Sequence, residues 1–464
     1  MTTDLILRRV ELHGRRCDVL LRDGRVADVG GPFQRTGEQA IDGVGGALLP
    51  GLHDHHLHLL ALAADLTSVH CGPPSVRGAD DLAAALRTAA ESTPSDAWIR
   101  GTGYHEQIAG DLDAQALDRW VPDRPLRIQH RSGALWMLNS LALRAVASVL
   151  DDSDDVERDE LGLPTGRLWR YDVRLRPALP SDPPDLAAVG RLLARYGITG
   201  VTDATPALDP STLDLLNTAR GTTLPQDLCL LGTPLDPALG PGRAPWKIHL
   251  RDHDLPGLDA LAAEITRARA AGRAVAVHCV TRVSLILTLT ALREVGPLAG
   301  DRIEHGAVVP PELHDWMRRL GVTVVTQPGF VATRGDDYLR DADPEDRGCL
   351  YPYRSLLEAS IPTVASSDAP YGPPDPWAIM RAARDRRTPS GAQLLPDEQV
   401  AVATTLDGYL APLADPAGRP RDIEPGAPAD LVLMQGSLRD CLAEPDAERV
   451  RLVLKDGAVV HTAS

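Results

Sequence analysis

The sequence lacks long apolar runs, paired cysteines and any excess of basic charge. No stretch approaches the roughly 18 apolar residues that a membrane-spanning helix needs, and the first residues lack the order of a signal peptide. The six cysteines show neither a CxxC pair nor regular spacing, which argues against a disulfide framework or a thiolate zinc site. We therefore expect a cytoplasmic protein in a reducing compartment, without a membrane segment.

Basic charge is scarce relative to acidic charge. The 48 Lys and Arg residues face 64 Asp and Glu residues, so the formal net charge is −16. A surface of this sign repels phosphates, which argues against nucleic acid or an anionic membrane as a partner. Aromatic residues make up only 4% of the chain, but 43% of the 464 residues are hydrophobic, which is enough for a large globular core.

The two ends of the chain share a hairpin pattern. Residues 18–29 and 451–460 each place β-rich runs on both sides of an Asp-Gly pair. Asp-Gly between such runs is a strong signal for a hairpin turn. Because an isolated hairpin is marginal in water, we expect residues 1–48 and 420–464 to pair into one small β-sandwich domain.

The middle of the chain, residues 49–419, alternates short β-branched runs with helical stretches rich in Ala, Leu and Arg. This alternation is typical of βα units around a parallel sheet. Eight strands are expected, at residues 47–52, 126–130, 199–205, 246–250, 274–279, 302–306, 322–327 and 362–367. Eight such units predict an α/β fold, a closed (β/α)8 TIM-like barrel, with its active site at the C-terminal ends of the strands.

Four histidines crowd into six positions directly after the first expected strand, at His53, His55, His56 and His58. Residues i and i+2 of an extended chain face the same side, so two imidazoles can converge on one metal ion. His53 with His55 and His56 with His58 both satisfy this spacing, and spacing alone does not choose between them. A solvated polar turn is the alternative interpretation.

Other metal-capable side chains lie at the ends of further strands. His278 and His305 end two of them, and Asp368 follows a third. Lys247 lies within another strand, where an unpaired ammonium is costly to bury, so it requires a partner or a modification. A buried salt bridge would explain this lysine alone, but strand ends that carry ligands together favour a metal site.

The order of these motifs resembles the amidohydrolase superfamily, in the amidohydrolase 3 (YtcJ-like) group of metal-dependent hydrolases. Residues 50–58, Pro-Gly-Leu-His-Asp-His-His-Leu-His, match the family's Pro-Gly-x-x-Asp-x-His-x-His, and this match selects His56 and His58. The similarity covers nearly the whole chain and continues at residues 98–104, 112–113, 121–125, 139–143, 162–166, 197–204, 302–305, 327–328 and 426–432.

The resemblance implies a metal site made of six residues, His56, His58, Lys247, His278, His305 and Asp368. It also implies that CO2 carboxylates the lysine to a carbamate that bridges two divalent ions, expected to be Zn2+, with a single ion as the alternative. A metal lowers the pKa of its bound water to about 7 and so supplies hydroxide at neutral pH. The aspartate would act as general base and then as general acid towards the leaving nitrogen.

Three departures from the family pattern leave the substrate open. Residues 132–134 read Ser-Gly-Ala where family members often have Asp-Gly-His. Cys279 and Val280 follow His278 where the family often has Gly-Asp, and the segment between Lys247 and His278 is short. The metal motifs are therefore kept while the pocket motifs differ, and function depends on the site rather than on the fold.

Four residues that follow or end expected strands are candidates to line the substrate pocket, with packing or loop solvation as the alternative: Tyr104, Arg131, Trp136 and Gln327. His249 lies two residues after Lys247 and can face the same opening. We interpret Cys279 as a buried structural thiol rather than a nucleophile, and Asp54 as a hydrogen-bond partner of the ligating histidines.

These observations predict a metal-dependent hydrolase that cleaves a C–N bond of a small-molecule amide, N-acyl or N-formyl amine, or cyclic amide. One alternative is a hydrolytic deaminase of an aminated heterocycle. Such enzymes of the superfamily usually carry Glu three residues after the fifth-strand histidine, where this chain has Thr281. Another alternative is a catalytically inactive metal-binding homologue, against which the presence of Asp368 argues. The oligomeric state stays open, with a homo-oligomer among the alternatives.

Overall fold

The structure, a computed structural model, describes residues 4–33, 39–73, 75–94, 96–180, 184–236 and 244–463. These residues form two compact units, one from the described parts of 1–59 and 186–464 and the other from 60–185. The second unit is therefore inserted in the chain between two segments of the first. The sequence-based boundaries at residues 48 and 419 did not separate it.

The first unit contains two parallel sheets, with strand orders β14-β13-β6 and β15-β16-β17-β18-β19. Parallel pairing connects each neighbouring pair of strands in both sheets. The strands are β6 Leu52–Leu57, β13 Ile198–Asp203, β14 Asp227–Leu230, β15 Trp246–Ile248, β16 Val275–Cys279, β17 Arg302–His305, β18 Thr323–Thr326 and β19 Thr363–Ala365. The expected α/β class, with helices between parallel strands, is thus confirmed.

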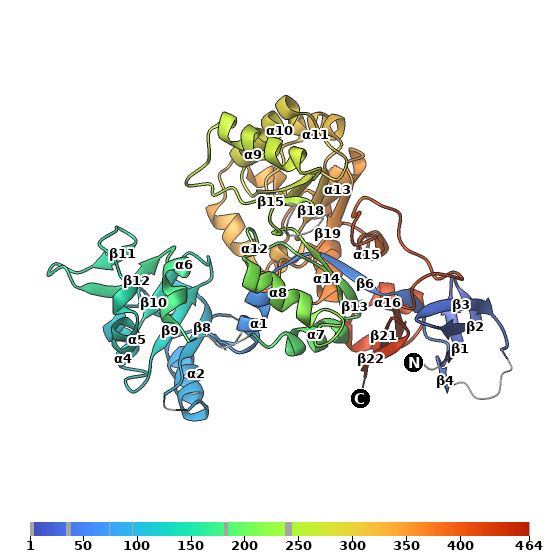
Figure 1. Ribbon diagram of the computed structural model, residues 1–464, viewed down its shortest axis with the longest axis horizontal. Coiled ribbons are helices and arrows are strands. Elements are labelled where there is room, and N and C mark those ends of the chain that lie inside the picture. The colour runs from blue at the N-terminus through green and yellow to red at the C-terminus, as the bar shows by residue number, and fades with distance from the viewer. Residues whose placement is uncertain are drawn as a thin grey trace. The chain divides into compact units, whose positions relative to one another are not determined.

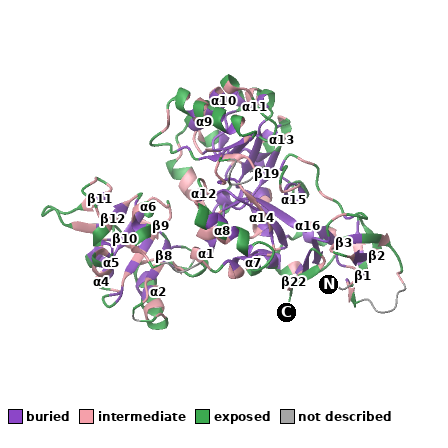
Figure 2. Cartoon of the chain, in the orientation of Figure 1, coloured by how far each residue is buried: buried purple, intermediate pink, exposed green. Residues whose placement is uncertain are grey.

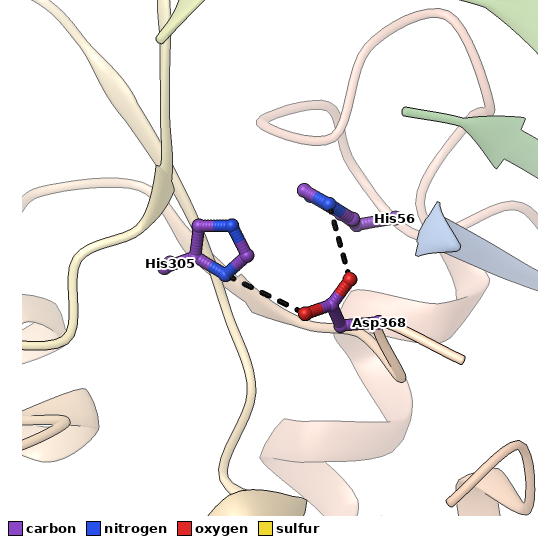
Figure 3. Close-up of side chains that lie close together, drawn as sticks. All are labelled: His56, His305 and Asp368. Carbon is purple, nitrogen blue, oxygen red and sulfur yellow. Dashed lines mark ion pairs between the residues drawn. The ribbon is translucent and has the colours of Figure 1, made fainter. Parts of the chain in front are cut away.

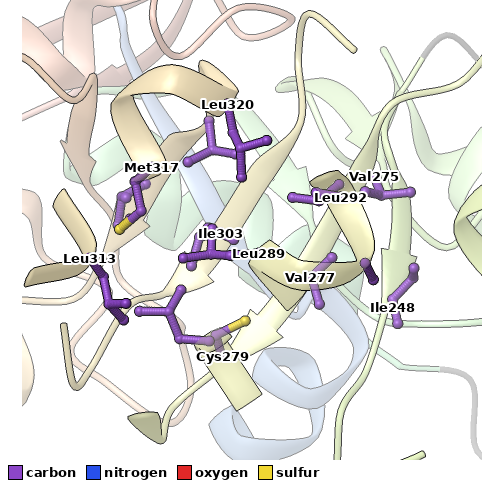
Figure 4. Close-up of a cluster of buried hydrophobic side chains, with 14 of the residues drawn as sticks. Ile248, Val275, Val277, Cys279, Leu289, Leu292, Ile303, Leu313, Met317 and Leu320 are labelled. Carbon is purple, nitrogen blue, oxygen red and sulfur yellow. The ribbon is translucent and has the colours of Figure 1, made fainter. Parts of the chain in front are cut away.

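Helices alternate with these strands and cover the five-stranded sheet. On α9 the buried residues Leu261, Ile265 and Ala268 recur at helical spacing, which gives the helix one apolar face. This face, α10, α11 and the strands share one hydrophobic core (Figures 1 and 4), and Figure 2 shows exposed residues on the outer sides of these helices. The helices are α7 Leu186–Arg195, α8 Pro210–Ala219, α9 Leu258–Ala270, α10 Arg282–Val295, α11 His314–Leu320, α12 Gly329–Asp341, α13 Tyr353–Glu358, α14 Pro376–Asp385, α15 Val402–Leu410 and α16 Leu438–Ala443.

The ends of the chain form two four-stranded sheets, with orders β3-β2-β1-β4 and β22-β21-β20-β5. Both predicted hairpins are confirmed, because β2 pairs with β3 and β21 with β22. The Asp-Gly residues at 23–24 and 456–457 all have positive φ, between 49° and 76°, as a type I′ turn requires. Apolar residues of both sheets belong to one buried cluster. The strands are β1 Leu5–Leu12, β2 Arg15–Arg22, β3 Arg25–Gly30, β4 Gln39–Asp42, β5 Leu48–Pro50, β20 Leu431–Met434, β21 Val450–Lys455 and β22 Ala458–Thr462.

The second unit is built on one six-stranded sheet of order β11-β12-β10-β9-β8-β7. Its strands are β7 Val69–His70, β8 Ile99–Tyr104, β9 Leu126–His130, β10 Leu135–Leu138, β11 Val156–Arg158 and β12 Pro164–Trp169. Its helices are α2 Ala79–Ser92, α3 Glu106–Ala109, α4 Ala114–Asp118, α5 Ser140–Ala145 and α6 Asp172–Leu175, and α1 Leu59–Leu66 begins at the unit boundary. Among the described helices of both units, none is long and apolar enough to cross a membrane.

This topology corrects one of the eight strand expectations. Residues 126–130 form β9, which lies in the second unit, where it pairs parallel with β8 and antiparallel with β10, and it is therefore not a strand of the two parallel sheets of the first unit. Gly133, with φ 75°, lies in the short turn that reverses the chain between these two strands. The remaining parallel strand is β14, whose sequence Asp-Leu-Cys-Leu is too short to show a clear periodicity.

The first expected strand, residues 47–52, is also divided. Its apolar part, β5, pairs with β20 in the sheet of the chain ends. A new strand, β6, begins at Leu52 and pairs with β13. The histidines 53, 55 and 56 therefore lie within a buried strand rather than in a turn after it.

Candidate metal centre

The two faces of β6 separate the four clustered histidines. His53 and His55 bond to backbone carbonyls near the end of α15, with His53 Nδ1 3.0 Å from the oxygen of Ala411 and His55 Nε2 3.1 Å from that of Gly408. His56 lies on the other face, and His58, just beyond the strand, approaches the same carboxylate, that of Asp368. The structure thus brings His56 and His58 together, as the family register predicts, and gives His53 and His55 hydrogen bonds to backbone carbonyls.

The Asp368 carboxylate lies among three imidazoles. His56 Nε2 is 3.5 Å and His58 Nε2 3.2 Å from Asp368 Oδ1, and His305 Nδ1 is 3.9 Å from Asp368 Oδ2. Figure 3 shows the carboxylate between the rings of His56 and His305. His56, His305 and Asp368 each offer one ligand atom, and these three atoms all lie within 4.8 Å of one another. One metal ion can span this spacing.

His278 and Lys247 extend this group along the five-stranded sheet. The ring centroid of His278 is 4.4 Å from that of His305, and the His305 centroid is 4.8 Å from that of His56. Lys247, on β15, is only 4% exposed, and its Nζ has no hydrogen-bond partner within the described ranges. The positive charge of Lys247 lowers the pKa of His56, His278 and His305, after the larger effect of their burial.

A buried ion pair supports His56 from behind. His56 Nδ1 bonds to Glu304 Oε2, while Arg302 Nε donates to Glu304 Oε1 at 2.8 Å. Arg302 also donates to the backbone oxygen of His55 at 2.8 Å. Because the Glu304 carboxylate accepts a hydrogen bond from Nδ1 of His56, the proton of the neutral ring stays on Nδ1. Nε2 therefore keeps its lone pair, which is directed towards Asp368.

Sequence reasoning missed Glu304 and Arg302. The signal was a pair of charged residues two positions apart in a short strand, Arg-Ile-Glu-His, which places both on one buried face. Regular alternation would direct His305 to the opposite face. At His305 the backbone instead has φ 70°, and Asp368 has φ 54°, so both residues leave their strands in the left-handed conformation that is rare outside glycine.

Further hydrogen bonds hold the other residues of the candidate metal centre in place. His305 Nδ1 lies 2.8 Å from Gln327 Oε1, and His58 Nδ1 lies 3.2 Å from Thr205 Oγ1. Asp54 Oδ1 accepts the backbone N–H groups of His56 at 3.1 Å and of residue 367 at 3.2 Å. Asp54 therefore ties β6 to the segment that carries Asp368, instead of contacting an imidazole as we expected.

Electrostatics keep the imidazoles neutral and the aspartate ionised. Burial lowers the pKa of His56, His278 and His305 below the ordinary histidine value. Burial also opposes ionisation of Asp368, but the hydrogen bond from His58 and nearby positive charges hold its pKa below the usual range. Neutral imidazoles and a carboxylate are the protonation states that a metal ion requires.

The donor set fits a divalent metal. Imidazole nitrogens and a carboxylate oxygen suit zinc, and His56 Nε2 is a buried polar atom without a hydrogen-bond partner among the residues described. Such an orphaned acceptor is costly unless something binds it. The centre is therefore a set of ligands ready for an ion rather than a satisfied hydrogen-bond network.

Of the residues expected in the substrate pocket, Gln327 lies at the centre, bonded to His305. Tyr104, Arg131 and Trp136 belong to the second unit. There the Tyr104 hydroxyl donates to the backbone oxygen of Gly110 at 2.5 Å. Trp136 Nε1 donates to the carboxylate oxygen Oδ1 of Asp172 at 2.8 Å. Their role towards substrate stays a prediction.

The second unit holds another histidine and carboxylate group, formed by His105, Glu106 and His130. In both histidines Nδ1 accepts a backbone N–H, at 3.2 Å from Gln107 and 3.1 Å from Ser132. The neutral ring then carries its proton on Nε2, which faces Glu106. A metal would need the Nε2 lone pairs, so this group is a satisfied hydrogen-bond cluster.

The first unit therefore combines a parallel α/β fold with a metal-capable centre at the strand ends. The sequence profile of the amidohydrolase family matches residues 39–461. The N-substituted formamide deformylase of Arthrobacter pascens is 26% identical over 502 aligned positions, which cover 91% of this chain and 90% of the relative. The protein YtcJ of Bacillus subtilis (strain 168) is 25% identical over 402 positions, 74% of each chain.

Solved structures show the same fold. An uncharacterized metal-dependent hydrolase from Pyrococcus horikoshii OT3 superposes with a TM-score of 0.74 at 20% identity, covering 99% of this chain and all of that one. The family match places the chain in the amidohydrolase family. The sequence-based expectation of an amidohydrolase enzyme is confirmed.

Substitution of Glu304 by Gln should weaken metal binding while the ligands themselves remain. The amide can accept the hydrogen bond from His56 but carries no negative charge. We therefore expect metal affinity to fall roughly 10- to 100-fold. Competition with a chromophoric chelator measures this affinity. Glu312→Gln, on an exposed side chain, is the matched control. Equal affinity in both variants would contradict the supporting role of Glu304.

Proposed function

We propose that this enzyme hydrolyses a C–N bond of a small amide, an N-acyl or N-formyl amine, or a cyclic amide. The observation that carries the proposal is the convergence of three imidazoles on one buried carboxylate, that of Asp368. An anionic base among neutral metal ligands suits hydrolysis, because one group has to take a proton from water and return it to the leaving group.

His56, His58, His278, His305, Asp368 and carboxylated Lys247 would hold the metal, two Zn2+ ions or one. When bound, a divalent metal makes water acidic enough to ionise near neutral pH and polarises a carbonyl oxygen. Burial lowers the pKa of Lys247, against the opposing charges of Glu304 and Asp368. A lower pKa increases the fraction of Lys247 that is neutral. The neutral amine has a free lone pair on Nζ, which can form an N–C bond with CO2 and release a proton.

Asp368 moves the proton in this proposal. Its carboxylate is ionised at neutral pH and accepts a proton from the attacking water. The same group then donates this proton to the nitrogen of the breaking C–N bond, so that the amine leaves in neutral form. His58 Nε2 lies 3.2 Å from Asp368 Oδ1, beside the oxygen that takes part in both steps.

The nature of a relative supports the choice of amides. The N-substituted formamide deformylase of Arthrobacter pascens matches over nine-tenths of both chains. Its name describes hydrolysis of a formamide with a substituent on nitrogen, which lies within the class that we propose here. We therefore place N-substituted formamides first among the substrates to be tested.

Metal content and hydrolysis test the proposal together. Plasma mass spectrometry on protein purified without chelator should give about two zinc or similar ions per chain, and intact mass under gentle conditions should show one added CO2. The loaded enzyme should hydrolyse members of an amide and formamide panel. Failure to hydrolyse any amide, ester or lactone at full metal occupancy would favour the inactive metal-binding alternative, and a single ion would bring the deaminase alternative forward.

Cys279→Ala should leave turnover within about twofold of the parent, because this thiol takes no part in the chemistry. Its Sγ lies 3.3 Å from the Thr288 hydroxyl, inside the hydrophobic core, and burial raises its pKa to about 12. A thiol of this kind is a poor nucleophile. Steady-state kinetics on the best substrate measures the effect, and a loss of more than a hundredfold would instead place Cys279 in the reaction.

The same proposal includes the finer architecture. We place the two parallel sheets as arcs of one (β/α)8 barrel, because backbone hydrogen bonds join their edges. Asp368 N donates to the oxygen of His56 at 2.8 Å, and Lys247 N donates to that of Leu231 at 3.1 Å. The shared apolar cluster of the two sheets at the chain ends supports the β-sandwich in the same way.

A further inference from the structure

Aromatic side chains are rare in this chain but gather beside the metal centre. The sequence has only two Phe and eight Tyr residues. Four of these ten, Phe330, Tyr338, Tyr351 and Tyr371, form what we call the aromatic cluster. The ring centroid of Tyr351 is 6.1 Å from that of Phe330 and 5.6 Å from that of Tyr338, and the Tyr371 centroid is 5.6 Å from that of His58.

The cluster stands at the ends of the strands that carry the metal ligands. Phe330 and Tyr351 pack with Ala307, two residues after His305, and with Val280, two residues after His278. Tyr371 follows Asp368 by three residues, and its backbone N–H donates to the oxygen of Asp368 at 2.8 Å.

The charge of Asp368 also reaches the phenols. Burial raises the pKa of Tyr351 well above its ordinary value, with smaller contributions from the Tyr338 hydroxyl and from Asp368. Asp368 likewise contributes to the raised pKa of Tyr338, after burial. Both phenols are therefore neutral. Phe330 and Tyr351 are only 4% exposed, so the accessible apolar surface of the cluster comes from Tyr371 and from the partly buried Tyr338.

Its members are held rigidly, yet one ring remains accessible. Arg334 lies over the Phe330 ring, 4.5 Å from its centroid, and donates to the backbone oxygen of Tyr371 at 2.8 Å. The hydroxyls of Tyr338 and Tyr351 are 3.3 Å apart. The Tyr371 residue is nevertheless 41% exposed.

The position of the proton donor, Asp368, relates this aromatic surface to the substituent on the substrate nitrogen. This step rests on the proposed function, in which Asp368 donates a proton to the leaving nitrogen. The nitrogen must then face Asp368, close to Tyr371, whose ring centroid is 5.6 Å from that of His58 and whose backbone bonds to that of Asp368. We propose that the aromatic cluster binds the N-substituent, and that the enzyme prefers amides whose nitrogen carries a bulky apolar or aromatic group.

Binding and turnover are measured with two matched pairs of compounds. N-hydroxy-N-(2-phenylethyl)formamide and N-hydroxy-N-methylformamide are metal-directed ligands whose Kd calorimetry gives without turnover. N-(2-phenylethyl)formamide and N-methylformamide are the corresponding substrates. With zinc-loaded full-length protein, we expect the phenylethyl ligand to bind about tenfold more tightly than the methyl ligand, and kcat/KM to follow the same order.

Tyr371→Ala should reduce this preference about fivefold, mainly through weaker binding of the phenylethyl compounds, since a ring contact of this kind contributes about 1 kcal/mol. Tyr338→Ala tests the cluster at a second position. Tyr196→Ala is the matched control, because this half-buried tyrosine precedes β13 and so lies at the opposite end of a strand. Metal content should be unchanged in all three variants.

The outcomes separate this inference from the proposed function. Equal Kd values for the two ligands, or a preference that survives in both Tyr371→Ala and Tyr338→Ala, would overturn the aromatic cluster as a binding surface. A preference in binding that these variants remove, with no hydrolysis of either formamide, would support the cluster and refute formamide hydrolysis. Hydrolysis of both formamides at equal kcat/KM would support amide hydrolysis and reject the preference.

Discussion

Asp368→Asn should lower kcat by about 10²- to 10⁴-fold, the contribution that a positioned general acid and base makes. The amide is nearly the same size as the carboxylate and can occupy the same place, where Oδ1 lies 3.2 Å from His58 Nε2. It cannot take up a proton from water at neutral pH. We therefore expect the folded structure to persist while turnover is lost.

Two further measurements make this result specific to proton transfer. Metal content should stay above half of the parent value, so that the loss of kcat does not reflect an empty centre. Asp407→Asn, at an exposed carboxylate on α15, is the matched control and should keep the parent kcat. An unchanged kcat in Asp368→Asn would remove this residue from its assigned role.

Lys247→Ala should lose most of the bound metal and with it most of the activity. If the carbamate bridges two ions, its removal deletes a ligand to both, and we expect metal content to fall to less than half and kcat/KM by about 10³-fold, as for loss of a direct ligand group. Formate, acetate or propionate should restore part of the activity, because a free carboxylate can occupy the space of the missing carbamate. Metal analysis and kinetics with and without these acids measure both effects.

The chain offers a matched control, because Lys455 is its only other lysine. Lys455 is also largely buried, but its Nζ lies within 3.4 Å of the carboxylates of Asp227, Asp430 and Asp456. These charges keep the pKa of Lys455 raised despite burial. Lys455→Ala should therefore lower Tm without changing metal content. Parent metal content in Lys247→Ala would refute the carbamate.

The contrast between the two lysines also separates two kinds of buried charge. Lys455 is compensated by carboxylates, as a buried ammonium in a structural role has to be. Lys247 Nζ has no hydrogen-bond partner among the described residues, and burial lowers its pKa against the charges of Glu304 and Asp368. A buried lysine whose Nζ lacks a hydrogen-bond partner and whose charge acts on nearby histidines is the arrangement expected of a group that reacts or binds metal.

Local sequence signals predicted the local structure well. The Asp-Gly pairs at 23–24 and 456–457 predicted both hairpins, because φ > 0 at two successive residues is a property of those residues alone. The βα alternation predicted the parallel strands, and seven of the eight expected segments overlap strands of the first unit. The types of the metal-capable residues were likewise apparent from their places after apolar runs.

Contacts between residues far apart in the chain could not be predicted from the sequence. Residues 126–130 have the composition expected of a strand of the central parallel sheet, but they pair with β8 and β10 in the sheet of the second unit. Tyr104 and Trp136 follow strands as pocket residues do, yet their polar atoms bond within the second unit. Periodicity describes one segment at a time and does not specify which segments become neighbours.

The sequence by itself determined the α/β class, the hairpins at both ends and the types of residue available for a metal centre. Spacing alone did not choose between the two histidine pairs; the family register selected His56 and His58, and the tertiary structure shows that these two face Asp368. It alone revealed Glu304 behind His56 and the aromatic cluster, whose members are up to 41 residues apart in the chain. The reason is physical: turns and periodicities depend on neighbouring residues, whereas a site forms where distant strand ends meet.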